Sequence, residues 1–180
     1  QVRQSLSDYA LAVLGAEGQD QVAQRLARRR AYDALGALSA AAQRSAAEPR
    51  NERLPTAQVL KLLDHGQRLM AHLSLVRLGL AGSWVASAGP TLTDSLSHTH
   101  RALTRLLANP AMANIDAANT NPAEPMASAW SDALDALPLT APEQDGLPWL
   151  QRRLGVLQKD AQAVQQSVLA LTASPASKNG

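Results

Sequence analysis

The sequence contains no cysteine and no phenylalanine, and aromatic residues make up only 3% of it. The lack of cysteine excludes disulfide bonds, thiolate metal ligands and cysteine nucleophiles. Without phenylalanine, a hydrophobic core must be built from leucine, valine and alanine. Chains rich in alanine and leucine favour helix, because these side chains lose little rotamer freedom there.

A long uninterrupted hydrophobic run is also missing. The most apolar window, residues 73–89, is about as long as the shortest membrane spans. It contains Arg77 and several serines and glycines, however. Residues 1–14 carry polar side chains where a signal peptide would have its apolar centre. We therefore predict neither a transmembrane helix nor a signal peptide in this sequence.

Neither sign of charge dominates, since 17 basic residues face 15 acidic ones and the formal net charge is +2. This balance does not indicate nucleic-acid binding. The 46% of apolar and 18% of charged residues are typical of a globular protein, and 180 residues suit one domain. We predict a single helical domain over residues 1–173 and a disordered polar tail over residues 174–180.

The sequence is rich in apolar residues that recur at alternating steps of three and four. This spacing places their side chains on one stripe of an α-helix, which must be buried against other helices. The predicted fold class is therefore all-α, an antiparallel bundle of five or six helices. The strictest stripe holds for three heptads and consists of Leu150, Leu154, Leu157, Ala161, Val164, Val168 and Leu171. A second stripe consists of Val59, Leu62, Gly66, Leu69, Leu73, Val76 and Leu80.

Glycine and proline punctuate the predicted helices. Asp20 is expected to cap the second helix, Pro55 to open the third, and Thr91 with Asp94 to form a capping box for the fourth. A continuous helix over residues 3–47 is an alternative for the first two. The predicted helices cover residues 1–14, 20–47, 55–81, 91–108, 125–137 and 149–173, with loops over 109–124 and 138–148.

The four histidines are the first candidates for a metal site. His65 and His72 lie seven residues apart and could share a helix face, but no third ligand has a suitable spacing. His98 and His100 should point to different sides of a helix. We predict no metal and no other cofactor.

Signatures of catalysis are absent as well. Serine and histidine are both present, but the sequence has no nucleophile elbow and no phosphate-binding glycine loop. Asp132 and Asp135 neighbour each other on a predicted helix, where paired carboxylates are usually solvated charges. We predict that the protein is not an enzyme.

The strongest local charge feature is the cluster Arg25, Arg28, Arg29 and Arg30. One interpretation is contact with anionic lipid head groups or with an acidic partner. The other is the solvated outer face of a long helix, with Glu17, Asp20 and Asp33 as nearby partners.

Each of Trp84, Trp130 and Trp149 lies near a predicted helix end or break. They could line a small-molecule pocket, or they could cap the edge of the core with the indole N–H at its rim.

One stretch of the sequence resembles a known family. Residues 28–35 (RRRAYDAL), residues 37–41 (ALSAA) and Glu48-Pro49 are similar to the helical segment of fusaric-acid-resistance-type (FUSC) inner-membrane proteins, in particular the YccS-type branch related to aromatic acid exporters. The leucine-rich residues 59–80 continue the similarity, which covers about the first 80 residues. The resemblance implies a basic, alanine-rich helix that leads from a transmembrane block into a cytoplasmic helical domain. It implies no catalytic residue.

Two further features agree with this resemblance. The chain begins at Gln1 rather than at methionine, so we expect it to be a fragment of a longer protein. Arginines near its start are typical of the cytoplasmic segment that follows a membrane span.

The resulting hypothesis is a non-catalytic cytoplasmic domain of an inner-membrane efflux protein, with an assembly or regulatory role. Its partners would be the membrane nearby and further copies of the parent protein. These copies would dock through an apolar stripe left over on one helix, with the heptad from Leu150 to Leu171 and its flank as the candidates. Alternatives are a free-standing helical ligand-binding or sensor domain, which could be periplasmic, and an enzyme with polar residues converging in a cleft.

Overall fold

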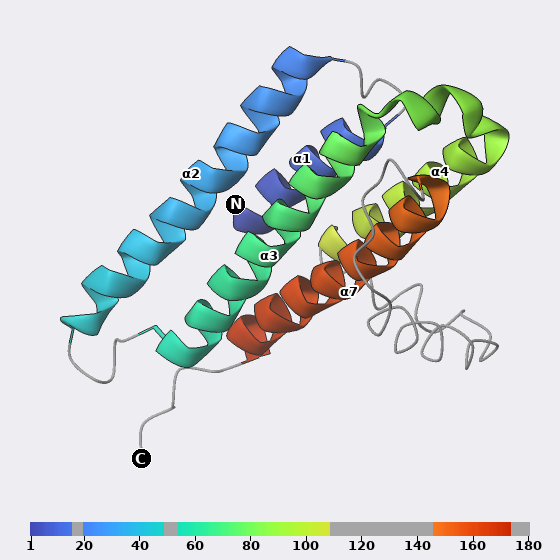
Figure 1. Ribbon diagram of the computed structural model, residues 1–180. Helices are drawn as coiled ribbons and strands as arrows, with labels where there is room; N and C mark the ends of the chain where they lie inside the picture. Colours follow the sequence, from blue (N-terminus) through green and yellow to red (C-terminus); the bar gives the residue numbers. More distant parts are fainter. Residues whose placement is uncertain (16–19, 49–53, 109–145, 174–180) are drawn as a thin grey trace, which may run out of the picture.

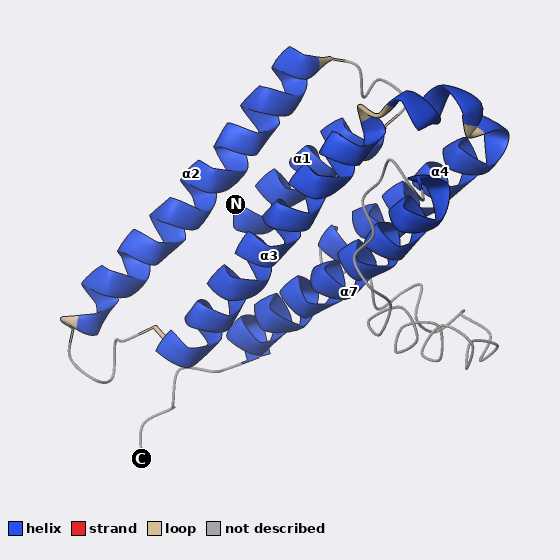
Figure 2. Ribbon diagram, viewed as in Figure 1, coloured by secondary structure: helices blue, strands red, loops and turns tan. Residues whose placement is uncertain are grey.

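The computed structural model describes residues 1–15, 20–48, 54–108 and 146–173, and these residues form an all-α fold without strands (Figures 1 and 2). The all-α prediction is confirmed. The predicted helix over residues 125–137, the loop over 109–124 and the tail lie outside the described residues. The elements are α1 (Val2–Leu14), α2 (Gln21–Ala46), α3 (Thr56–Leu80), a short 3₁₀ helix η1 (Ser83–Ser87), α4 (Gly89–Leu107) and α7 (Gly146–Ala173).

The helices pack in two layers. In Figure 1, α2, α3 and α7 lie in front, while α1 and α4 lie behind them. Helix α1 packs against α2, α3 and α4, and α4 packs against α7. Sequential neighbours are antiparallel, but α4 and α7 run in the same direction, as Figure 1 shows. A parallel pair needs a long connection, and the segment between Leu107 and Gly146 is long enough to return the chain.

The two predicted apolar stripes face each other across α3 and α7. The first five residues of the α7 stripe are at most 3% exposed, and Leu69, Leu73 and Val76 of the α3 stripe are fully buried. The stripe of residues 150–171 was expected to be left over for docking a second copy. That expectation is wrong for most of the heptad, which fills the core of its own bundle. Docking of a second copy through the flank of the stripe stays a prediction.

The helix boundaries follow local chemistry at several ends. The Asp20 carboxylate accepts hydrogen bonds from the backbone N–H groups of Val22 and Ala23, at 2.9 and 3.0 Å, which confirms the predicted cap. Gly15 is extended, with φ −70° and ψ 158°, so α1 ends at Leu14. The alternative of one continuous helix over residues 3–47 is therefore wrong.

Two predicted starts differ from the structure. The capping box of Thr91 and Asp94 does not form, because α4 begins earlier, at Gly89, with Pro90 in its first turn. Proline is well suited to the first turn, since it has no N–H group that would need a partner there. Helix α7 likewise begins at Gly146, so Pro148 lies in its first turn instead of in the predicted loop.

Candidate functional site

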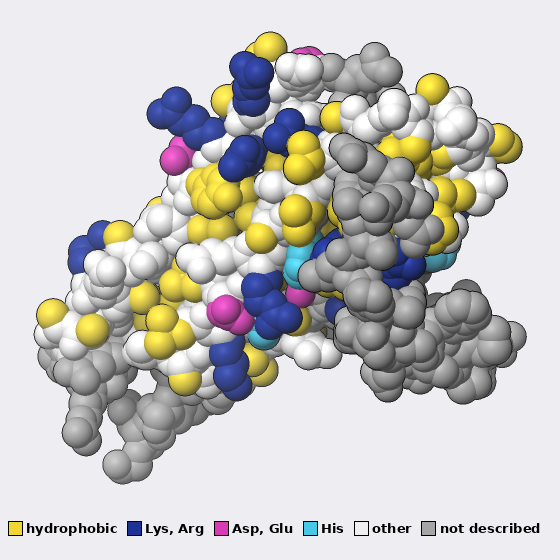
Figure 3. Space-filling view, viewed as in Figure 1, with side chains coloured by type: hydrophobic (Ala, Val, Ile, Leu, Met, Phe, Trp, Pro, Cys, Tyr) yellow, Lys and Arg dark blue, Asp and Glu magenta, His cyan; other side chains and the backbone are white. Residues whose placement is uncertain are grey.

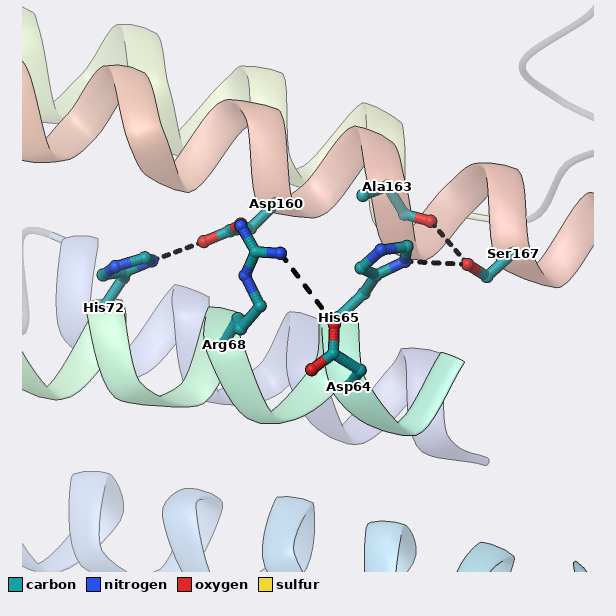
Figure 4. Close-up of polar contacts among 7 residues, drawn as sticks. All are labelled: Asp64, His65, Arg68, His72, Asp160, Ala163 and Ser167. Carbon is teal, nitrogen blue, oxygen red and sulfur yellow. Dashed lines mark hydrogen bonds and ion pairs between the residues drawn. The ribbon is translucent and has the colours of Figure 1, made fainter. Parts of the chain in front are cut away.

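The main polar cluster lies on the seam between α3 and α7, and Figure 4 shows its side chains reaching across it. Asp160 of α7 is 4% exposed. Its Oδ2 lies 2.5 Å from Nδ1 of His72, and its Oδ1 lies 3.8 Å from a guanidinium nitrogen of Arg68. Arg68 also lies 3.8 Å from Asp64, one turn earlier on α3.

His72 is the principal partner of this buried carboxylate. A buried charge is costly unless it is paired and hydrogen-bonded. The Arg68 side chain is 58% exposed, whereas the His72 side chain is 21% exposed. Solvent screens the Arg68 contact, so His72 offsets most of the desolvation of Asp160. The pair ties α3 to α7 in one register.

A second histidine bridges the same two helices near the end of α7. Nδ1 of His65 lies 2.9 Å from the hydroxyl oxygen of Ser167, and that hydroxyl donates its proton to the carbonyl of Ala163 at 2.8 Å. The single hydroxyl proton is therefore already used, so Nδ1 of His65 must be the donor to Ser167. A histidine in this state cannot act as the base that activates the serine.

The two histidine pairs do not combine into a catalytic triad. A triad needs an acid and a nucleophile on the same imidazole. Here the acid Asp160 contacts His72, while the hydroxyl of Ser167 contacts His65, two helical turns away. The sequence predicted the two histidines on one helix face, but gave no sign of their partners, which follow 88 and 102 residues later.

The structure also places the other metal candidates. His98 is exposed and His100 is half-buried, with an Nε2 atom that is shielded from solvent and has no hydrogen-bond partner in the part of the chain that the structure describes. Within the described ranges, no three His, Asp or Glu side chains come together in a way that could hold a metal ion. Asp132 and Asp135 lie outside these ranges.

The tryptophans are used for packing. Trp149 is 6% exposed, its ring lies against Gly79, and the Arg153 guanidinium lies 5.7 Å from the ring centre. The ring of Trp84 lies against Gly82 and Gly146, and its indole N–H is buried without a partner among the described residues. The predicted position of the N–H at a solvated rim is therefore wrong for Trp84. Trp130 lies outside the described residues.

The predicted arginine cluster lies on the exposed side of α2, together with apolar side chains. We call this exposed set the arginine surface; it consists of Val22, Arg25, Leu26, Arg28, Arg29, Arg30 and Tyr32. Arg29 lies 3.9 Å from Asp33, and the Arg28 guanidinium lies 5.6 Å from the centre of the Tyr32 ring. Of the predicted acidic partners, Asp33 is thus near an arginine, whereas Asp20 caps the helix.

The end of α3 continues this surface. Helix α3 is antiparallel to α2 and ends beside the start of α2. Its last turns expose Leu75, Arg77 and Leu78, and Leu78 is 65% exposed. Figure 3 shows hydrophobic and basic side chains intermingled over this end of the molecule. The sequence predicted the arginines but not the exposed leucines at the adjacent end of α3.

A cavity that sequence reasoning missed lies at the opposite end of α3. It has a volume of about 610 Å³ and opens between the first turn of α1, the middle of α2 and the end of α7. We call it the end cavity. Its lining includes Val2, Arg3, Leu38, Leu62, Val168 and Leu171. No signal in the sequence brings these residues together, because they come from four helices.

Comparison of the chain with protein-family models, with curated proteins and with solved structures gave no match in any of the three. Among the described helices, none is both long and apolar enough to span a membrane.

Proposed function

We propose that this bundle is a non-catalytic, cytoplasmic domain of an inner-membrane efflux protein, with an assembly or regulatory role, and that the arginine surface rests on the anionic face of the membrane. The proposal is supported by the resemblance of residues 28–49 to FUSC-type proteins. The observation that carries it is the combination of exposed arginines and exposed apolar side chains on α2 and the adjacent end of α3.

A membrane surface suits this combination better than water does. Val22 is 73% exposed and Leu26 is 47% exposed, although a solvated helix face would normally carry polar residues there. Side chains of this kind bury in the head-group region, while arginines beside them attract anionic lipids. The steps of three, four and seven residues from Val22 to Arg25, Leu26 and Arg29 place these side chains on one face of α2.

The polar seam supports the non-catalytic part of the proposal. Both histidines on the seam make contacts that hold α3 against α7, and neither has the pair of partners that nucleophilic catalysis requires. Removing either histidine should therefore affect stability rather than a reaction.

The test is flotation of the purified chain with lipid vesicles. Binding is expected to vesicles that contain one third phosphatidylglycerol, and not to pure phosphatidylcholine vesicles. The double variant Arg25→Gln/Arg28→Gln should reduce the partition coefficient roughly 25-fold, because each arginine near an anionic surface contributes about 1 kcal/mol.

Two matched controls make this test specific. Arg101→Gln/Arg105→Gln removes the same charge from exposed positions of α4, which packs on α1 and α7, and should leave binding unchanged. Leu78→Ser should weaken binding, whereas Leu60→Ser, at a 57% exposed position at the other end of α3, should not. Equal losses in the variants and their controls would contradict the membrane contact.

The assembly role has its own test. The sequence that precedes Gln1 in the parent gene should encode several apolar spans, and the purified parent protein should sediment as an oligomer. A signal peptide at that place would instead favour the second candidate, a free-standing ligand-binding domain. The observation that favours this second candidate is the end cavity.

A further inference from the structure

The end cavity has an aliphatic wall. Four helices contribute to it, through Val2 of α1, Leu38 of α2, Leu62 of α3, and Val168 and Leu171 of α7. Its volume of about 610 Å³ lies within the range of small-molecule sites, which is about 300–1,000 Å³. None of the described residues that line it is aromatic, so this part of the wall offers no ring on which a planar ligand could stack. Such a wall fits a flexible saturated chain.

Among the described residues of this lining, Arg3 has a charged side chain, and Gln1, Gln4 and Thr172 contribute polar groups beside it. It is half-buried, and it forms neither a hydrogen bond nor an ion pair with any described residue. This distinguishes it from Arg29 and Arg68, which lie close to carboxylates. A guanidinium presents several N–H donors in a planar fork that matches a carboxylate, and such a contact is strongest where water is partly excluded.

We infer that the end cavity binds an amphiphilic monocarboxylate with a medium-length saturated chain. The chain lies against Leu38, Leu62 and Val168, and the carboxylate pairs with Arg3 at the mouth. A mainly apolar wall beside an arginine provides this chemistry, with the wall giving affinity and the arginine selecting the charge. The inference goes beyond the proposed function and does not depend on a membrane contact, because the end cavity and the arginine surface share no residue.

The test is a titration of the purified chain with octanoate, followed by calorimetry and by NMR shifts of the cavity residues. Octanoate should bind with a stoichiometry of one, and octylamine, which has the same chain and the opposite charge, should bind at least tenfold more weakly. Arg3→Gln should weaken octanoate binding about tenfold, because a hydrogen bond to a charged group contributes about 1.5 kcal/mol or more. Arg101→Gln, at an exposed position of α4, should have no effect.

A blocking variant tests the position of the chain. Ala37 of α2 is exposed and lines the cavity, so Ala37→Phe should fill the space and abolish binding. Ala71→Phe, at an exposed position of α3 outside the lining, is the matched control and should bind normally. Circular dichroism should confirm that both variants remain helical.

Three results would overturn the inference. The first is equal affinity for octanoate and octylamine, and the second is octanoate binding that survives Ala37→Phe. The third is self-association of the chain that Ala37→Phe removes and octanoate does not change, because the occupant of the cavity would then be a second copy. Arg3→Gln should leave vesicle flotation unchanged, so failure here is distinguishable from failure of the proposed function.

Discussion

Nδ1 of His72 lies 2.5 Å from Oδ2 of Asp160, and this contact joins α3 to α7 across an interface that is mainly aliphatic. Asp160 is almost fully buried, and beside His72 it has Arg68 at 3.8 Å. An aliphatic interface alone permits several registers of two helices. The buried Asp160 carboxylate permits only one register, because sliding one helix along the other would separate it from His72.

His72→Leu is therefore expected to lower the free energy of unfolding by about 2–3 kcal/mol, because it leaves a buried carboxylate with only a screened partner. His65→Leu should cost about 1 kcal/mol or less, since the hydroxyl of Ser167 keeps its hydrogen bond to Ala163. Urea denaturation of both variants measures the difference. Equal costs would show that Asp160 does not depend on His72.

Leu157 tests the role of the strict heptad. It is fully buried, so Leu157→Ala should lower the free energy of unfolding by about 3 kcal/mol. Leu60→Ala, at a position 57% exposed, should change it by less than about 0.5 kcal/mol. Sedimentation should give the same native mass for Leu157→Ala as for the unchanged chain. A drop in native mass would mean that the heptad joins two copies after all.

Gly79 is expected to tolerate no side chain. A Cβ atom there would lie 2.3 Å from the ring of Trp149, which is buried and cannot move away freely. Gly79→Ala should therefore destabilise the protein by about 1–3 kcal/mol.

The matched control for Gly79 is Gly36, in the middle of α2, where an added Cβ meets nothing within 4 Å. Gly36→Ala should stabilise the protein by about 0.5–1 kcal/mol, because alanine loses less backbone entropy in a helix. Thermal unfolding of the two variants should shift in opposite directions, and an unfolding temperature that Gly79→Ala leaves unchanged or raises would contradict the packing of Trp149 on Gly79.

Asp20 should contribute to stability through its cap. Asp20→Ala removes the acceptor for two backbone N–H groups of α2 and should cost about 1 kcal/mol. Asp33→Ala removes an equal charge from an exposed ion pair on the same helix and should cost under about 0.5 kcal/mol. Chemical denaturation of both variants provides the comparison, and a larger cost for Asp33→Ala would contradict the capping role.

Much of the fold was predictable because the relevant forces act within one helix. The stripe from Leu150 to Val164 is visible from spacing alone, and the structure buries it within the bundle. The Asp20 cap is also a local signal, since its carboxylate contacts residues two and three positions later. The start of α4 was mistaken because two local signals competed, and proline in the first turn at Gly89–Pro90 prevailed over the Thr91 capping box.

The candidate sites were much less predictable. His65 and His72 could be placed on one face of a helix. Whether they bind a metal or join two helices depended on Asp160 and Ser167, which lie far away in the sequence. The arginines could be found, but the exposed Leu78 beside them could not, since leucine is usually buried. The pairing of helices decides which side chains meet.

The sequence by itself determined that the chain is helical, which faces of α3 and α7 are apolar, and where most helices end, because these properties arise from backbone geometry and residues within a turn or two. The tertiary structure alone decided that most of the strict heptad is internal, that Asp160 meets His72, and that Arg3, without a described partner, lines a cavity with a mainly aliphatic wall. The physical reason is that spacing fixes which side chains share a stripe, whereas the packing of one helix against another fixes which stripe is buried and which polar groups become neighbours.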